Sequence, residues 1–131
     1  MSKLILIRGL PGSGKTTLAL SMVGENRDIF HIEADMFFLD AHGVYRFDKS
    51  RLRAAHDWCY THATNHLRMG KTVIVSNTFT RLQEMQPYIK YAMRHNHDWQ
   101  IIVCHGEYPS IHNVPPETIA RMKARWEDLD D

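Results

Sequence analysis

Eight consecutive residues near the amino terminus constrain the fold of this chain more than any other feature. Residues 9–16 read Gly-Leu-Pro-Gly-Ser-Gly-Lys-Thr, which is the Walker A spacing of two glycines, a lysine and a hydroxyl residue. They follow the apolar, β-branched run 3–7 and precede residues 16–24, where apolar side chains recur at helical spacing. A glycine loop between a strand and a helix is the context in which this motif binds phosphate; the alternative is a glycine turn with a purely structural role.

The residue types of this loop suit the binding of a nucleoside triphosphate. Glycines allow backbone angles that turn successive N–H groups towards phosphate oxygens, and a helix that starts near Lys15 directs the positive end of its dipole at them. We expect Lys15 to reach the β- and γ-phosphates and the Thr16 hydroxyl to ligate magnesium, so ATP and Mg²⁺ are the predicted cofactors. The residues predicted to contact ATP are Gly9, Leu10, Pro11, Gly12, Ser13, Gly14, Lys15, Thr16 and Thr17.

Strand-like and helix-like segments alternate along the rest of the chain. Further strands are predicted at 28–33, 72–75 and 99–104, and further helices at 51–69, around 87–93 and at 116–126. This order predicts an α/β fold, a P-loop NTPase three-layer sandwich whose parallel sheet of about four strands has helices on both faces. The length of 131 residues suits one domain, 1–131, with its ligand site at the carboxyl ends of the strands.

Composition favours a protein of the cytoplasm. The formal net charge of +1 gives no general case for nucleic-acid binding. No apolar run is long enough to span a membrane, and the apolar residues 4–7 are too few for a signal peptide. Because of this lack of a spanning run, we expect no membrane association. Cys59 and Cys104 lie far apart and form no CxxC pair, so we expect free thiols in a reducing compartment.

Two carboxylates follow the second predicted strand. Asp35 stands where a P-loop kinase faces its acceptor, and a carboxylate there can accept the proton of an acceptor hydroxyl. Glu33, two residues earlier on the same side of the chain, is the rival base. Asp35 can instead cap a short helix over residues 36–39, because aspartate is a favoured N-cap residue. The residues alone leave these interpretations open.

Several short motifs beyond the loop carry a resemblance to known proteins. They are Ala34-Asp35-Met36-Phe37-Phe38, Tyr45-Arg46-Phe47, Ala55-His56-x-Trp58, Asn77-Thr78, Glu84-Met85-x-Pro87-Tyr88 and Val114-Pro115. In this order they resemble the small AAA/zeta-toxin-like P-loop kinases, which include the ATP-binding domain of a ubiquitin-ligase-binding protein family and bacterial and phage relatives. More distantly, the chain is similar to the 5′-kinase domain of phage polynucleotide kinase.

The resemblance implies an ATP-dependent kinase. Such an enzyme moves the γ-phosphate of ATP to a hydroxyl of a small metabolite, a nucleoside or a polynucleotide 5′ end, and the sequence does not single out one acceptor. Carried over by residue, the resemblance implies Lys15 and Thr16 for ATP and Mg²⁺, and Asp35 as the general base. The alternative function is a nucleotide-binding module or weak ATPase with little kinase activity.

Three departures from the family pattern bear on this expectation. Relatives often carry an aspartate after the third strand, where this chain has Ser76 and Asn77. Polynucleotide kinase has an arginine for the acceptor phosphate three residues after its base, where this chain has Phe38, which weakens the case for a nucleic-acid acceptor. Relatives carry an arginine-bearing lid helix after the fourth strand, whereas residues 104–113 contain neither arginine nor lysine. The sequence therefore predicts a shortened lid.

The shortened lid leaves the transition-state cation to be supplied from elsewhere. Phosphoryl transfer spreads negative charge over the equatorial oxygens, and the lid offers only His105 and His112, which are mostly neutral near pH 7. Arg81 is the first candidate, because it begins the segment after the third strand at the carboxyl edge of the sheet. Arg121 and Arg125, predicted one turn apart on the last helix, come next, followed by a residue of another subunit.

Overall fold

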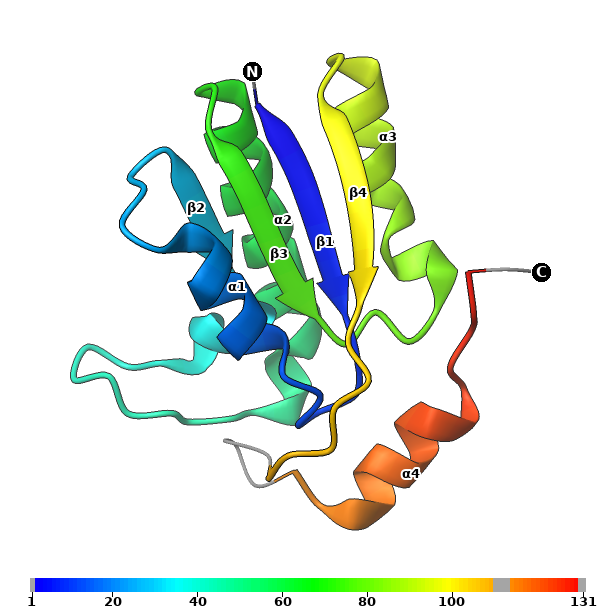
Figure 1. Ribbon diagram of the computed structural model, residues 1–131. Helices are drawn as coiled ribbons and strands as arrows, with labels where there is room; N and C mark the ends of the chain where they lie inside the picture. Colours follow the sequence, from blue (N-terminus) through cyan, green and yellow to red (C-terminus); the bar gives the residue numbers. More distant parts are fainter. Residues whose placement is uncertain (1, 110–113, 130–131) are drawn as a thin grey trace.

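The computed structural model describes residues 2–109 and 114–129 (Figure 1). Within them the sheet consists of β1 (Lys3–Arg8), β2 (Ile29–Ile32), β3 (Thr72–Asn77) and β4 (Asp98–Val103). Neighbouring strands are all parallel, in the order β2-β3-β1-β4, which confirms the predicted parallel sheet. β3 continues two residues beyond its predicted end, and Ser76 and Asn77 pair with Ile7 and Arg8 of β1.

Helices follow the strands as the apolar spacing predicts. They are α1 (Lys15–Val23), α2 (Leu52–Arg68), α3 (Gln86–Arg94) and α4 (Pro116–Ala124), with the short 3₁₀ turns η1 (Ala34–Phe38), η2 (Lys49–Arg51) and η3 (Leu82–Glu84). In the described part of the chain, none of these helices is both long and apolar enough to cross a bilayer.

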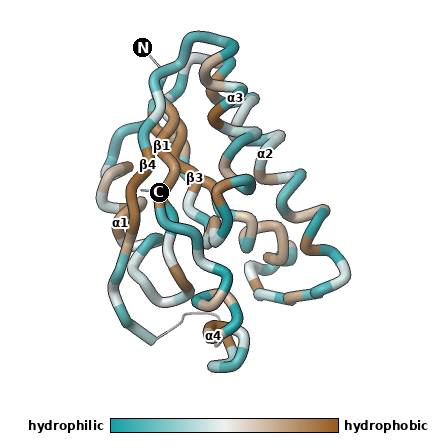
Figure 2. The backbone as a smooth tube through the Cα atoms, turned by 90° about the vertical axis from the view of Figure 1, so that its right-hand side faces the viewer, coloured by the Kyte–Doolittle hydropathy of each residue, from teal (hydrophilic) through white to brown (hydrophobic). Residues whose placement is uncertain are grey.

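The alternation of side chains along β1 explains why both faces of the sheet are covered. Leu4 and Leu6 are buried in one apolar cluster with residues of α2 and α3, whereas Ile5 and Ile7 are buried in a second cluster with residues of α1. Successive side chains of a strand point to opposite faces. The apolar strands therefore lie between α1 on one side and α2 and α3 on the other, which confirms the three-layer sandwich (Figure 2).

The last helix departs from the expected layering. α4 lies beyond the carboxyl edge of the sheet, and none of its residues is buried (Figure 1). It ends at Ala124, so Trp126, which lies inside the predicted helix 116–126, belongs to the segment that follows. The Trp126 ring packs on the guanidinium of Arg8 instead, with 3.9 Å between Arg8 Cζ and the ring centroid. Residues 125–129 are called the C-terminal segment below.

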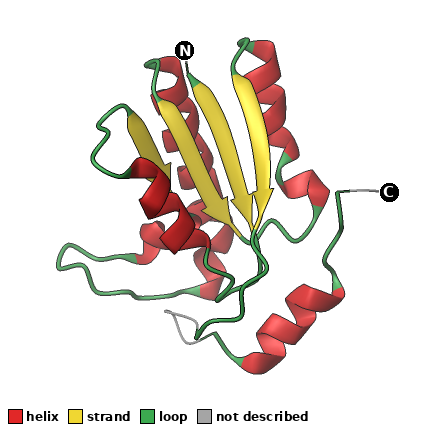
Figure 3. Ribbon diagram, in the orientation of Figure 1, coloured by secondary structure: helices red, strands yellow, loops and turns green. Residues whose placement is uncertain are grey.

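The carboxyl ends of the strands form the functional edge of the molecule. The strand arrows all point to this edge, where the loop after β1 meets the segments that follow β3 and β4 (Figure 3). Backbone hydrogen bonds join these segments: the Gly9 amide donates to Thr78 O over 3.3 Å, and the Cys104 amide donates to Arg8 O over 2.8 Å. Parallel α/β sheets bind their ligands at this edge.

Candidate functional site

The phosphate loop, residues 9–16, joins β1 to α1 at the carboxyl edge of the sheet. Gly14 is the N-cap of α1 and has a φ of 95°, in the left-handed region that favours glycine. The first helical hydrogen bond runs from the Leu18 amide to Gly14 O at 3.0 Å, so the amides of Lys15, Thr16 and Thr17 precede the ladder of α1. Because the first turn of α1 holds no acidic residue, its positive end can act on an anion.

Lys15 is held against its own loop. Its ammonium group donates a hydrogen bond to Leu10 O over 3.0 Å. Burial lowers the pKa of Lys15, and the nearby Glu33, Cys104 and Asp35 act in the opposite direction. A cation already partly withdrawn from water has less hydration to lose when it meets a phosphate oxygen. The position suits the predicted contact with the γ-phosphate end of a nucleotide.

Thr16 is hydrogen-bonded to Glu33, the carboxylate that the sequence analysis gave as the rival base to Asp35. The Thr16 hydroxyl donates to Glu33, with Oγ1 2.7 Å from Oε2 and 3.1 Å from Oε1. A hydroxyl that gives its proton to a carboxylate keeps its lone pairs for a metal and gains electron density on oxygen. Mg²⁺ prefers oxygen ligands of this kind together with phosphate oxygens and water. The residues present therefore fit a magnesium ion, and Glu33 brings the negative charge that Ser76 and Asn77 lack.

Asp35 lies in the first turn of η1 and has a different partner. The Tyr45 hydroxyl donates to Asp35 Oδ1 over 3.2 Å. Burial and the Asp35 charge both raise the pKa of Tyr45, so the phenol stays protonated and remains a donor. The N-cap of η1 is Glu33, so the interpretation of Asp35 as the N-cap residue is wrong. Because the 3₁₀ turn starts at Ala34, Asp35 is its second residue and lies two positions after the N-cap.

The two residues that replace the family aspartate have structural hydrogen bonds. Asn77 Oδ1 accepts from the Ala34 amide at 2.9 Å, and Asn77 Nδ2 lies 3.7 Å from Cys59 Sγ. Ser76 Oγ lies 2.6 Å from His31 Nε2. Asn77 thus fixes the start of the turn that carries Asp35. The sequence analysis had noted Ser76 and Asn77 only as the residues in place of an aspartate, because a side chain that bonds a distant backbone amide leaves no local pattern.

Aromatic side chains surround the turn that carries Asp35. Phe38, which occupies the place of the phosphate-binding arginine of polynucleotide kinase, is buried, with ring centroids 5.1 Å from Phe47 and 6.2 Å from Tyr45. Arg51 packs on one of these rings, with Cζ 4.8 Å from the ring centroid of Phe37. The surroundings of Asp35 are therefore mainly apolar and aromatic.

The three arginines that the sequence analysis gave as candidates for the transition-state cation have different surroundings in the structure. Arg81 is exposed at the N-cap of η3, three residues after Thr78, and within the described residues no hydrogen bond joins it to the loop. Arg121 donates to Thr118 on α4 over 3.2 Å. Arg125 follows the end of α4 and donates to Thr80 Oγ1 over 3.1 Å, so the predicted shared helical face of these two arginines is wrong.

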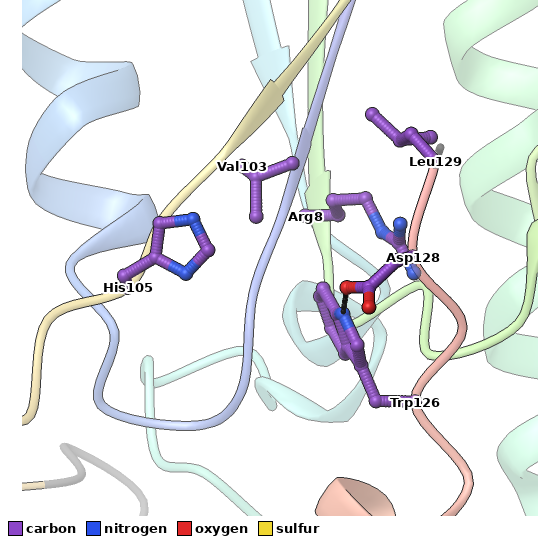
Figure 4. A pocket seen from close by; sticks show the side chains of 6 residues that line it. All are labelled: Arg8, Val103, His105, Trp126, Asp128 and Leu129. Carbon is purple, nitrogen blue, oxygen red and sulfur yellow. Dashed lines mark hydrogen bonds between the residues drawn. The ribbon is translucent and has the colours of Figure 1, made fainter. Parts of the chain in front are cut away.

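The C-terminal segment is fastened to the residue that precedes the loop. Arg8 is completely buried, and its Nη2 donates to Phe79 O and Glu127 O, each at 2.7 Å. Beside it lies a cavity of about 290 Å³ that Trp126 and Asp128 help to line (Figure 4). His105 also lines this cavity, and His112 lies outside the described residues.

The described part of the short lid contacts the loop through its backbone. The Gly106 amide donates to Ser13 O over 3.1 Å, and the Tyr108 amide donates to Gly12 O over 2.7 Å. No helix forms in residues 104–109, in agreement with the predicted loss of the lid helix. The loop is thus braced by β3 on one side and by these residues on the other.

Known proteins are similar to this chain in sequence and in architecture. A family profile described as an AAA domain matches residues 4–108. Human NEDD4-binding protein 2 is 30% identical over 134 residues, which cover 95% of this chain and 8% of that protein. The chain therefore corresponds to a small part of this relative.

Solved structures confirm the fold. A chain of the Pnkp1/Rnl/Hen1 RNA repair complex superposes with a TM-score of 0.72 at 18% identity, covering 95% of this chain and 43% of that one. The Mycobacterium tuberculosis APS kinase CysC, solved with AMPPNP and APS, gives a TM-score of 0.60 at 17% identity over 92% of this chain and 67% of that one. At these identities the likeness establishes a common P-loop, kinase-like fold.

Proposed function

The chain belongs to this AAA domain family of P-loop, kinase-like proteins, and we propose that it is a Mg²⁺- and ATP-dependent kinase that transfers the γ-phosphate to a hydroxyl acceptor. The observation that carries the proposal is that the two carboxylates after β2 have different hydrogen-bond partners. Glu33 bonds Thr16 of the phosphate loop, whereas Asp35 bonds Tyr45. One carboxylate is thereby assigned to the nucleotide and metal, and the other to the acceptor.

The phosphate loop would bind the triphosphate. The amides at the start of α1 and the Lys15 ammonium would contact the phosphate oxygens. The Thr16 hydroxyl, bonded to Glu33, would hold the magnesium, which neutralises phosphate charge when bound. Glu33 acts on the metal through the Thr16 hydroxyl, so its part is to position and polarise that ligand.

Asp35 would act as the general base. The acceptor oxygen gives its proton to the Asp35 carboxylate and forms a bond to the γ-phosphorus, while the bond from that phosphorus to the β–γ bridging oxygen breaks and ADP leaves. The hydrogen bond from Tyr45 fixes the orientation of the carboxylate.

A second candidate, a nucleotide-binding module with little turnover, is favoured by the placement of the arginines. Arg8 and Arg125 flank the loop but donate to backbone or hydroxyl oxygens, and residues 104–109 bring no cation. Arg81, exposed just after β3, remains our candidate for the cation that stabilises the transition state. Free Cys59 and Cys104 are consistent with the cytoplasmic location that we propose.

The test is ADP formation from Mg·ATP in the presence of chosen acceptors. The panel contains RNA and DNA 5′-hydroxyl ends, nucleosides, adenosine 5′-phosphosulfate and small polyols. ADP that appears only with an acceptor, together with a phosphorylated acceptor, supports the kinase. Acceptor-independent phosphate release supports an ATPase, and nucleotide binding without either product supports the module.

Lys15→Ala is the control variant for this assay. Removing one partner of a desolvated charged contact costs about 2–5 kcal/mol, so Mg·ATP affinity should fall by roughly 30- to several thousand-fold. Lys90→Ala, which removes an exposed lysine on α3, should bind as the parent does. Equal affinity of Lys15→Ala and the parent protein would remove the phosphate-loop assignment.

A further inference from the structure

Tyr108 presents an aromatic ring beside the phosphate loop. Its side chain is 67% exposed, although its amide is bonded to Gly12 O at 2.7 Å. A side-chain carbon built on Gly14 would lie 3.4 Å from Tyr108 Cε2, so one edge of the ring is at contact distance from the N-cap of α1. A large apolar ring that is anchored through its backbone and still faces solvent suits a ligand contact better than a place in the core.

Gly106 leaves room for the Tyr108 ring, because any larger residue at this position would overlap it. A side-chain carbon on Gly106 would lie 2.5 Å from Tyr108 Cε2 and 2.7 Å from Ser13 O. Only glycine at this position leaves room both for the ring and for the hydrogen bond from the Gly106 amide to Ser13 O. The ring position is therefore set by two backbone hydrogen bonds and one glycine.

The sheet order places Tyr108 at the nucleoside end of a bound triphosphate. The strand that carries the loop, β1, lies between β3 and β4, with β2 beyond β3. Asp35 follows β2 and Tyr108 follows β4, so they lie on opposite sides of the loop. If the γ-phosphate points to the acceptor at Asp35, the α-phosphate and the nucleoside must leave towards β4.

We propose that Tyr108 is the stacking platform for the nucleobase of the bound nucleoside triphosphate. This rests on the proposed nucleotide binding and adds the residue that holds the base. Stacking uses the π-face that every base has, so ATP and GTP should both use the ring.

Calorimetric titration of the full chain with Mg·ATP, Mg·GTP and Mg·tripolyphosphate tests the proposal. Tyr108→Ala should weaken both nucleotides by about 5- to 150-fold, the range for a lost base–aromatic stack, and leave tripolyphosphate affinity unchanged. Tyr108→Phe should bind as the parent does, because the ring rather than the hydroxyl is used. Trp99→Ala, an exposed ring at the amino end of β4, is the matched control and should change none of the three affinities.

Each outcome of these titrations either supports or overturns the assignment of Tyr108 as the stacking platform. Unchanged nucleotide affinity in Tyr108→Ala, or an equal loss for nucleotides and tripolyphosphate, overturns the platform, the second because the ring would then serve the loop and not the base. A parent protein that binds neither ATP nor tripolyphosphate overturns the proposed function itself, and the platform with it. Selective loss of the nucleotides supports both.

Discussion

The two sides of the phosphate loop are built by different means. On the β2 and β3 side, side chains bond one another, as in the pairs Thr16–Glu33 and Tyr45–Asp35. On the β4 side, backbone amides of Gly106 and Tyr108 bond carbonyls of the loop. A side-chain bond is lost with one substitution, whereas a backbone bond survives most of them. The first side should therefore be sensitive to point changes in its chemistry, and the second mainly to changes in shape.

The largest expected effect comes from the acceptor carboxylate. Asp35→Asn keeps the size of the side chain but cannot take a proton, so the rate of phosphoryl transfer should fall by about 100- to 10,000-fold. Mg·ATP affinity should change much less than the transfer rate, because the hydrogen bonds of Lys15 and Thr16 run to Leu10 and Glu33. Single-turnover transfer and calorimetric titration measure the two quantities. Normal transfer in this variant would show that Asp35 is not the base.

The metal side should respond differently. Glu33→Gln removes the negative charge of the carboxylate that accepts a hydrogen bond from the Thr16 hydroxyl. Losing a group that hydrogen-bonds a metal ligand lowers metal affinity by about 10- to 100-fold. The Mg²⁺ concentration needed for half-maximal ATP binding should rise by that factor, while the rate at saturating Mg²⁺ changes less. If Glu33→Gln instead abolishes transfer at saturating Mg²⁺ and Asp35→Asn does not, the roles of the two carboxylates are exchanged.

The C-terminal segment should affect stability and leave the chemistry alone. Trp126→Ala removes the ring that covers the Arg8 guanidinium, and a partly desolvated cation–π contact is worth about 1–2 kcal/mol. Urea unfolding should show this loss, and Trp126→Phe should restore part of it. Transfer rates at 25 °C should match the parent. A transfer defect larger than the stability loss would mean that this segment takes part in the reaction.

The smallest effect concerns pH. Burial lowers the pKa of His31, opposed by Glu33, so the folded state holds the imidazole neutral while the unfolded chain protonates it near its ordinary value of about 6.5. The unfolded state then binds more protons, and the free energy of unfolding falls as the pH drops below that value. Urea titrations from pH 7.5 to 5.5 should show a shallower decline for His31→Asn than for the parent. An equal decline would assign the dependence to other groups, such as His97, whose pKa is also lowered by burial.

Sequence periodicity predicted the sheet well because β1 and β3 are apolar and buried on both faces. The phosphate loop was predicted equally well, since its glycines and Lys15 are required by local geometry. The division between Glu33 and Asp35 was not, because both follow the same strand and only the tertiary position of Thr16 separates them. The fate of Trp126 was missed for a similar reason: its partner, Arg8, is distant in the chain.

The burial of Arg8 also has a consequence for how the protein is made. Its side chain bonds Glu127, 119 residues later, and its strand pairs with β3 and β4, which are synthesised after it. At about 5–20 residues per second, roughly 6–24 s separate the two partners on the ribosome. Until β3 has been synthesised, the apolar strand β1 has no neighbouring strand to pair with. A nascent chain stalled before residue 72 would carry the whole Walker A sequence without a nucleotide site.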